Sequence, residues 1–436
     1  MKKIWILFIF CFLNNNSLVS QNSTSSPYSF YGIGSLNFKG TAENRSMGRL
    51  TIHNDSIHMN FSNPASFSGN NMFSFNNEGR LVKFTVGLGH SETKLNTENQ
   101  QSEVSNSSFD YLGLNVPMGK FGFGFGLIPH TSVGYELESL NSDNLIKYNY
   151  FGSGGLNKTF LGFGYQVNDN FSLGISASYS FGNLNNSAIE FLYDDEMNPL
   201  AYQTRQEDRS DLSGINYKIG LIYSDKITSE IEFTTSVVIS PKHTLTSKNS
   251  RNYATVGVNS NNQVSFIVNE INVDLEPLGL HETDIIMPLK TSLGIGFGKI
   301  KKWFVGAEYT SINSQNFSNG LLEIDNSQFE DYSLYSIGGF YIPDYSSFGE
   351  IWKRFVYRGG FYYEKTGLVI NSESIDEFGI SFGLGIPVGS MFSNINASIE
   401  LGRRGTKDAF LVEENFVNLQ LSLSLNDRWF IERKYN

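Results

Sequence analysis

Histidine, cysteine and paired acidic residues are the side chains of this sequence that could carry out catalysis or bind a metal ion. The six histidines are scattered, and only His53 and His58 lie close together. Their spacing does not match a zinc-binding helix, and no strand offers a His beside a Ser or Asp as a hydrolase would need. We therefore expect no catalytic residue, no metal site and no cofactor. Two acidic pairs are interpreted as solvated loop tips: Asp194-Asp195 and Glu413-Glu414.

The elements that position these side chains are predicted to be long strands, most clearly between Gly155 and Gly182. Apolar residues occupy every second position on both sides of the turn 168–170, and the positions between them are small or polar. This period of two predicts an antiparallel hairpin whose strands exceed the roughly five or six residues usual in soluble sheets. Strands of about ten residues with one apolar face are typical of barrels that span a membrane.

The first 20 residues have the features of a secretory signal peptide. Lys2 and Lys3 precede an apolar run from Ile4 to Leu13, and small residues follow. Cleavage there would remove Cys11, the only cysteine, so no disulfide framework is expected. Later in the chain no apolar run approaches the roughly eighteen residues of a membrane helix. We therefore predict a protein of the Gram-negative outer membrane that crosses the membrane with strands.

Residues 81–436 are predicted to form an all-β, transmembrane antiparallel barrel of about fourteen strands. Alternating segments recur from Val82 to Leu425, and short turns alternate with long polar connections. The longest connection is expected to be a loop from Ser240 to Asp284, and the strand near 332–341 lacks a clean apolar face. An even number of strands places both ends of the barrel on its periplasmic side.

Residues 21–80 precede the first strand and are dense in Gly, Ser and Asn. The apolar side chains between Phe30 and Phe61 are nevertheless too numerous for a solvated linker. We interpret this segment as an ordered plug inside the barrel. Some inward-facing wall positions carry charges, which we expect to hydrogen-bond the plug rather than to select ions. These charged positions are Lys83, Lys218, Glu232, Glu308, Arg358 and Glu400.

The plug ends in Asn63-Pro64-Ala65, just before the first strand. The tripeptide is open to a purely structural interpretation as an Asn-Pro turn. A plug with this ending resembles that of the FadL-type outer-membrane transporters of long-chain fatty acids and aromatic hydrocarbons. The resemblance implies that Asn63, Pro64 and Ala65 belong to a hatch. The segments 26–34 and 427–430 look like FadL-related barrels of Bacteroidota.

The third predicted strand, which begins at Phe121, has Gly122, Gly124 and Gly126 on its inner face and ends in Pro129. Proline cannot donate a hydrogen bond to a neighbouring strand, so bending here costs little. In FadL-type proteins a kink in the third strand opens the wall toward the bilayer, and the resemblance implies the same here. The alternative is that the strand packs its glycines against the plug.

Two functions follow from the resemblance. The first is uptake of hydrophobic small molecules through a plug-gated, lateral route, which predicts an apolar pocket between plug and wall. The second is that of an accessory barrel that accompanies the large channel of the type 9 protein secretion system, which predicts a stable complex with a larger barrel. Outer-membrane lipid and lipopolysaccharide are expected to surround the protein in both cases. A net charge of -11 argues against a nucleic-acid partner.

Overall fold

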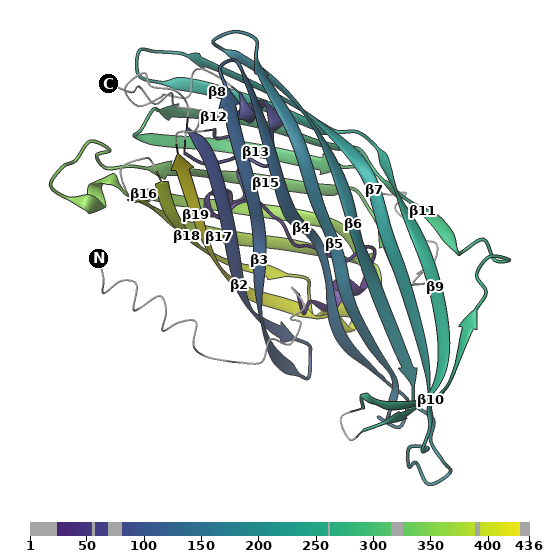
Figure 1. Cartoon of the computed structure of the whole chain (residues 1–436). Coiled ribbons are helices and arrows are strands. Elements are labelled where there is room, and N and C mark those ends of the chain that lie inside the picture. The colour runs from purple at the N-terminus through teal and green to yellow at the C-terminus, as the bar shows by residue number, and fades with distance from the viewer. Residues whose placement is uncertain are drawn as a thin grey trace, which may run out of the picture.

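The computed structural model describes residues 24–54, 57–68, 81–259, 262–314, 326–388 and 393–427. The predicted signal peptide, residues 1–20, and the end of the chain beyond Asp427 lie outside the described residues. Figure 1 shows one sheet that curves into a barrel around the N-terminal segment. The predicted all-β barrel with an internal plug is therefore confirmed.

The wall has fourteen antiparallel strands, and its first half contains the longest ones. Sheet neighbours follow the chain order, and the last strand pairs with the first. The first six wall strands are β2 (Val82–Asn96), β3 (Gln101–Met118), β4 (Phe121–Leu140), β5 (Ile146–Gln166), β6 (Phe171–Glu190) and β7 (Gln203–Lys226).

Three wall strands are interrupted along their length. The seventh consists of β8 (Glu232–Ser240) and β9 (His243–Val258), since β7 pairs with both. The eighth consists of β10 (Val264–Val273), β11 (Glu282–Met287) and β12 (Lys290–Lys299), and the tenth of β14 (Ser327–Phe329) and β15 (Tyr332–Tyr341). The uninterrupted strands of this half are β13 (Trp303–Ile312), β16 (Val356–Ile370), β17 (Glu373–Val388), β18 (Ser393–Arg404) and β19 (Glu413–Asp427).

The expected loop from Ser240 to Asp284 is wrong, because β9, β10 and the start of β11 occupy most of it. β9 pairs with β7 over residues 203–213 and then with β10, so the sheet continues well past the expected strand ends. β7 alone has 24 residues. An apolar period of two marks only the part of a strand with one face in lipid, and these extensions do not keep that period: β9 is mainly polar, and β10 has consecutive apolar residues from Phe266 to Val268.

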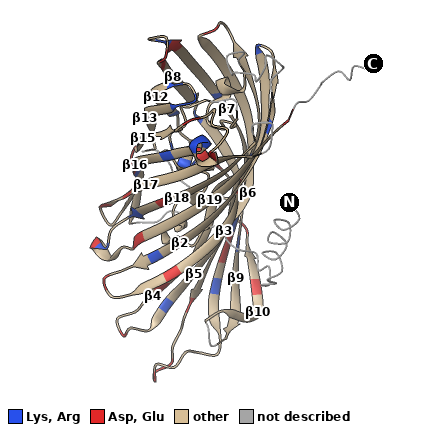
Figure 2. Ribbon diagram, turned by 90° about the vertical axis from the view of Figure 1, so that its left-hand side faces the viewer, with Lys and Arg blue, Asp and Glu red and all other residues tan. Residues whose placement is uncertain are grey.

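The outer face of the wall carries the apolar positions predicted from the alternation. Leu161, Phe163 and Ile175 are 46%, 55% and 52% exposed on an isolated chain, which is the environment expected of lipid-facing side chains. Most of the strand area in Figure 2 is tan, the colour of uncharged residues, with single charged positions along the strands and a group of them on a short helix inside the barrel. Within the described ranges, no helix has the length and apolar character needed to span a membrane.

The plug runs along the barrel interior (Figure 1). Its short elements are η1 (Pro27–Phe30), β1 (Ser35–Leu36), α2 (Ala42–Arg45) and η2 (Pro64–Phe67), and the wall adds the turns η4 (Ile351–Arg354) and η5 (Asp408–Phe410). Each of the four buried apolar clusters joins the plug to the wall, through Ile33, Phe61, Tyr28 and Leu50 respectively. The plug therefore supplies the hydrophobic core that the small inner side chains of the wall do not.

Candidate functional site

The Asn63-Pro64-Ala65 tripeptide forms a capped turn that is bonded to the wall. The Asn63 Oδ1 accepts a hydrogen bond from the Ala65 backbone N–H at 3.0 Å, so Asn63 caps η2 with Pro64 at its start. The Asn63 Nδ2 donates to the Leu221 carbonyl of β7 at 3.1 Å. One side chain therefore fixes both the shape of the turn and its position on the barrel.

Glycines on three adjacent wall strands allow this turn to lie directly against the sheet. A Cβ on Gly220 would lie 2.0 Å from the Asn63 Oδ1, and one on Gly174 would lie 2.2 Å from the Ala65 nitrogen. On β5, a Cβ on Gly164 would lie 2.9 Å from the Pro64 carbonyl oxygen. Glycine weakens a strand unless another backbone must come close, and here it does. We call these three residues the glycine floor.

The glycines of β4 lie beneath the same turn. A Cβ on Gly122 would lie 2.0 Å from the Phe67 carbonyl oxygen, and one on Gly124 would lie 2.8 Å from the Phe67 ring. A Cβ on Gly126 would lie 2.6 Å from the Phe160 ring. The positions predicted to kink the wall are therefore packed against the plug and its neighbouring ring.

The backbone pairing between β3 and β4 ends immediately beyond these glycines. β3 and β4 pair only from Met118↔Phe121 to Leu112↔Leu127. Beyond that point β3 continues along β2, and β4 continues along β5 after an irregularity next to Pro129. Within the described residues, no backbone pairing joins 101–111 of β3 to 128–140 of β4, and we call this interval the seam.

The plug occupies part of the seam. Its strand β1 pairs with β4 through Ser35↔Ser132 and Leu36↔Thr131, and the Asn37 N–H donates to the His130 carbonyl at 3.0 Å. The plug thus takes the place on β4 that β3 has left. Of the residues predicted for a wall kink, Gly122, Gly124 and Gly126 lie where β3 and β4 are still paired, and Pro129 lies just beyond the last pair, Leu112↔Leu127.

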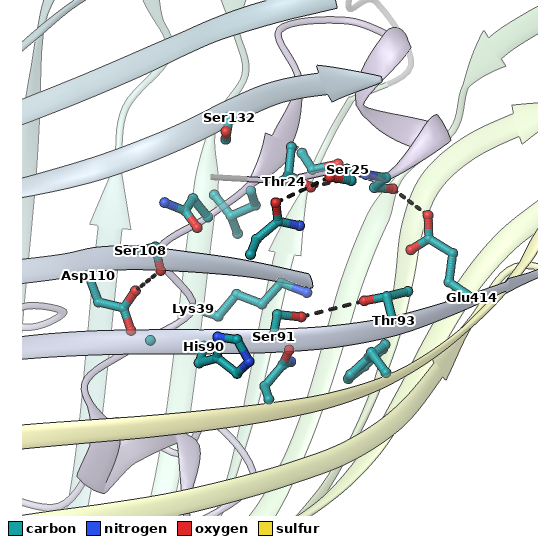
Figure 3. Close-up of a pocket in the computed structure, with 18 of the residues that line it drawn as sticks. Thr24, Ser25, Lys39, His90, Ser91, Thr93, Ser108, Asp110, Ser132 and Glu414 are labelled. Atoms are coloured by element: carbon teal, nitrogen blue, oxygen red, sulfur yellow. Dashed lines mark hydrogen bonds between the residues drawn. The ribbon is translucent and has the colours of Figure 1, made fainter. Parts of the chain in front are cut away.

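A cavity of about 120 Å³ lies between the plug, β2, β3, β19 and the seam (Figure 3). Its lining is mostly polar and includes Lys39, His90, Asp110, Ser132 and Glu414. Figure 3 shows Asp110 bonded to Ser108 on the wall. This cavity does not have the apolar lining that uptake of a hydrophobic molecule predicts.

Beside the cavity, a buried ion-pair network ties the plug to β16–β19. The Arg49 guanidinium lies 2.5 Å from a Glu364 oxygen, 2.5 Å from a Glu377 oxygen and 3.1 Å from a Glu400 oxygen. Its carbon lies 3.5 Å from the centroid of the Tyr362 ring, whose hydroxyl donates to Glu377 and Glu400. A guanidinium can satisfy several carboxylates at once because its donors form a planar fork.

The network is balanced in charge. Lys39 of the plug lies 2.8 Å from Glu377, and Arg45 lies 3.4 Å from Glu400. Arg404 of the wall pairs with Glu377 and, at 3.6 Å, with Glu414. Four cations therefore face four carboxylates, because Arg49 and Glu364 complete the set. Charges removed from water in this way are tolerable only because each one is paired.

Burial, and after it the charge of the nearby Arg49, lower the pKa of Lys39 to about 8 against the opposing effect of Glu377. The plug lysine is therefore the cation of the network that loses its proton first as the pH rises.

The interpretation of Glu413-Glu414 as a solvated tip is wrong. Both residues lie in β19, and Glu414 is buried and accepts a hydrogen bond from Ser26 at 2.5 Å.

Most charged positions predicted on the inner wall do contact the plug. Lys83 donates to the His58 carbonyl at 3.0 Å, and Glu308 accepts from the Thr51 hydroxyl at 2.8 Å. Lys218 and Glu400 also bond plug residues, whereas Arg358 donates to Asn396 of the wall at 3.1 Å.

Sequence reasoning missed Arg49, Glu364, Glu377 and Arg404 as a group. The available signal was that Glu377 shares the inner-face period of Gly379 and Ser381.

The close pair His53 and His58 is part of the packing inside the barrel. The His53 ring lies 4.7 Å from the Phe304 ring and 4.8 Å from the Phe340 ring, and the His58 Nε2 lies 3.8 Å from a Glu43 oxygen. Across the described ranges, no three His, Cys, Asp or Glu side chains gather in a metal-binding arrangement.

Replacing Gly360 with alanine should destabilise the protein by about 1–3 kcal/mol, because a Cβ there would lie 2.2 Å from the Gly48 nitrogen of the plug. Gly359, the adjacent residue of β16, faces the other side and would place a Cβ no closer than 3.9 Å to any atom. Urea unfolding in detergent, followed by the heat-modifiable gel mobility of folded barrels, measures both variants. Equal stability of Gly360→Ala and Gly359→Ala would show that the plug turn does not touch β16.

Solved structures of the same fold come from proteins that differ widely in sequence. The chain is similar to the toluene transporter TodX of Pseudomonas putida, at 15% identity, with 91% of this chain and 99% of that chain covered and a TM-score of 0.58. It is also similar to the toluene transporter TbuX of Ralstonia pickettii, at 15% identity, with 89% of this chain and 98% of that chain covered and a TM-score of 0.56. For a FadL homologue of Pseudomonas aeruginosa the identity is 14%, the covered shares are 90% of this chain and 98% of that chain, and the TM-score is 0.54.

These likenesses establish the FadL and TodX type of barrel predicted from the plug and strands. No relative is found among curated protein sequences. A family model described as BamG matches residues 1–436, the whole sequence. The chain therefore belongs to the BamG family.

Proposed function

We propose that this protein is an outer-membrane barrel that passes hydrophobic small molecules, with the plug as the gate and the seam as a lateral exit. The observation that carries the proposal is the unpaired interval between β3 and β4 with the plug strand β1 lying in it. A lateral opening that reaches the bilayer would release an apolar molecule there without exposing it to water. Asn63, Pro64 and Ala65 would hold the fixed end of the gate on the glycine floor.

The chemical class of the substrate is supported by the fold neighbours, two of which are named toluene transporters. The belt of exposed aliphatic and aromatic side chains supports the membrane position. Because the plug fills the lumen as described, passage requires β1 to leave β4. This requirement gives the proposal a direct test.

A disulfide between Ser35→Cys and Ser132→Cys should abolish uptake when oxidised and restore it on reduction. The two residues are antiparallel partners, and such partners have Cα separations of about 4.5–5.5 Å, which a disulfide can span. The only native cysteine is Cys11, within the predicted signal peptide, so the pair should form without competition. Uptake of labelled toluene and oleate by expressing cells, with and without dithiothreitol, measures the effect.

The matched control is Ser178→Cys with Asn216→Cys, partners on β6 and β7 that lie in the continuous wall. Oxidation of this pair should leave uptake unchanged. Wild-type uptake through the oxidised Ser35–Ser132 variant would contradict the lateral route. Leucine at Gly122, Gly124 and Gly126 is a poorer test, because a side chain at Gly122 would collide with the Phe67 carbonyl.

A second candidate function is that of an accessory barrel in an outer-membrane assembly, of which a channel for protein secretion is one example. The polar lining of the cavity and the buried ion pairs between plug and wall favour it, because both disfavour an apolar ligand in the lumen. Affinity purification from native membranes in mild detergent separates the two functions. A stoichiometric larger barrel in the eluate supports the accessory role, and bound lipid or hydrocarbon without protein supports the carrier.

A further inference from the structure

The connection between β15 and β16 is longer than the other turns on its rim of the barrel, the rim where β2 begins and β19 ends. It spans residues 342–355. The turns between other strands of this rim span residues 119–120, 167–170, 227–231 and 300–302. Figure 1 shows the long connection projecting from the barrel beside β16. We call residues 342–355 the rim turn, and neither function considered above requires it.

The rim turn has a fixed backbone. The Asp344 N–H donates to the Lys353 carbonyl at 2.7 Å, which joins the two sides of the turn. The Ile342 N–H donates to the Lys302 carbonyl of the neighbouring turn at 2.7 Å, and the Lys302 Nζ donates to the Pro343 carbonyl at 2.5 Å. The helix η4 lies between these contacts and β16. The turn therefore presents its side chains from defined positions.

The outer part of the rim turn exposes three large apolar side chains. Phe348 is fully exposed, and Ile351 and Trp352 are 54% and 50% exposed. We call these three residues the apolar tip. Apolar side chains that gather on a protein surface mark a site of contact with a membrane or another molecule. We therefore expect the apolar tip to be covered in the native membrane.

The rim turn lies against the lipid-facing side of the wall. The Tyr357 hydroxyl donates to the Trp352 carbonyl at 3.1 Å. Tyr357 is the antiparallel partner of Tyr341, and both side chains point outward, 39% and 49% exposed. Phe361 continues the same face along β16. The apolar tip is therefore an extension of the lipid-facing belt beyond the strand ends, where barrels usually carry aromatic residues.

Lysine side chains lie over the aromatic rings of this region. The ammonium nitrogens are 4.7, 5.4 and 5.5 Å from the ring centroids in the pairs Lys301–Tyr345, Lys302–Tyr341 and Lys353–Trp352. An aromatic face attracts a cation, and a lysine stem can lie along apolar surface while its ammonium group stays in the polar layer. These pairs place positive charge where the apolar belt ends.

Basic residues outnumber acidic ones in this region. The rim turn and residues 300–302 together contain four basic residues and two acidic ones, namely Lys301, Lys302, Lys353, Arg354, Asp344 and Glu350. Glu350 pairs with Lys353 at 2.9 Å, and cations remain in excess after this pair and Asp344 are counted. The whole chain, by contrast, has a net charge of -11. A positive segment beside a membrane attracts anionic lipids.

We propose that the rim turn is a lipid anchor. Its apolar tip enters the phospholipid leaflet at this rim, and its lysines hold the phosphate groups of anionic phospholipids there. Continuity with the lipid-facing belt and the excess of cations both favour lipid as the occupant. A partner protein as occupant would leave Trp352 in water when lipid alone is present. The inference is independent of whether the barrel transports hydrocarbons.

The fluorescence of Trp352 tests the position of the apolar tip. The sequence has four tryptophans, of which Trp5 lies in the predicted signal peptide, so Trp303→Phe with Trp429→Phe leaves Trp352 as the reporter. The protein is reconstituted into phosphatidylcholine vesicles whose acyl chains carry bromine near the headgroup. The emission should be blue-shifted and strongly quenched by the bromine. Emission typical of water, without quenching, would overturn the proposal.

The matched control moves the reporter to another exposed apolar position. Leu278→Trp, combined with Trp352→Phe, places it in the connection between β10 and β11, where Leu278 is 64% exposed at the opposite end of the barrel. This reporter should stay unquenched. A second variant, Phe348→Ser with Ile351→Ser, should shift the Trp352 emission to the red and reduce its quenching. Both side chains are exposed, so the barrel should keep its heat-modifiable gel mobility.

The headgroup preference is measured with the same reporter in mixed vesicles, in which either phosphatidylglycerol or phosphatidylcholine carries the bromine. Phosphatidylglycerol should associate with the rim turn more strongly than phosphatidylcholine. Lys301→Gln with Lys353→Gln leaves as many carboxylates as cations and should lower this preference by roughly fivefold for each lysine removed. Lys94→Gln removes an exposed lysine of the opposite rim and should leave it unchanged. Equal association of the two lipids in the wild type, or an unchanged preference in the double lysine variant, would overturn the assignment to anionic phospholipids.

Discussion

Replacing Arg49 with methionine should lower the free energy of unfolding by about 3–5 kcal/mol, the usual cost of removing one partner from buried ion pairs. The side chain of Arg49 is 3% exposed, and its loss would leave Glu364, Glu377 and Glu400 without their shared cation. Methionine keeps much of the volume, so the effect would report charge rather than a cavity. Urea unfolding of the purified barrel, read from gel mobility without boiling, measures it.

The control for this variant is Arg209→Met, which removes an ion pair with Asp211 whose side chains are 49% and 55% exposed. Exposed pairs contribute about 0–1 kcal/mol, so this variant should remain close to the wild type. Lysine at position 49 keeps the charge but not the planar fork, and it should fall between the two. If Arg49→Met were as stable as Arg209→Met, the wall carboxylates that Arg49 contacts would have to be hydrated, and the network would not hold the plug.

Deletion of residues 22–70 should convert the barrel from a closed to an ion-conducting state. The wall would still form, because each strand pairs with its neighbours in the wall, apart from the short β1–β4 contact. The lumen would lose the residues that fill the four apolar clusters and would be lined largely by Gly and Ser. A barrel of about fourteen strands without its filling is wide enough for ions and water. Planar-bilayer conductance of the deletion variant against the full-length protein measures the change.

The variant to compare with the plug deletion is Pro64→Ala, which keeps the plug but loosens the turn on the glycine floor. This variant should conduct in brief openings and not as a steady pore. Equal conductance of the full-length and deleted proteins would mean that residues 24–68 do not seal the lumen. In that case neither the gate nor the lateral route would stand as proposed.

The outer surface of this barrel could be predicted from the sequence, because every second residue of a membrane-spanning strand faces lipid and is apolar. Leu161, Phe163 and Ile175 follow that rule, as do the corresponding positions in the other wall strands. The extensions between Ser240 and Asp284 could not be predicted, because those strands do not alternate apolar and polar residues with a period of two. Their existence depends on pairing with β7, which is a property of two distant segments.

For the interior, the sequence predicted that a plug is present but not which residues of plug and wall meet. The sequence indicated that a plug was present and that wall charges would bond it, and Lys83, Lys218 and Glu308 do so. It did not indicate which carboxylates meet Arg49, because these lie on three strands brought together by register. The same limit applies to the seam, since it arises where the pairing of β3 and β4 ends and no single residue marks that point.

The closing contact of the wall constrains the order in which this protein can assemble. Residues 82–96 of β2 pair with 413–427 of β19, so the barrel is completed by joining the first and last of its strands. The plug precedes β2 in the chain and carries Lys39, Arg45 and Arg49 into positions surrounded by wall. A charged segment could not be threaded into the finished barrel without stripping its water first. We therefore expect the plug to lie against the open, curved sheet before β19 pairs with β2, so that closure of the barrel encloses a segment already in place.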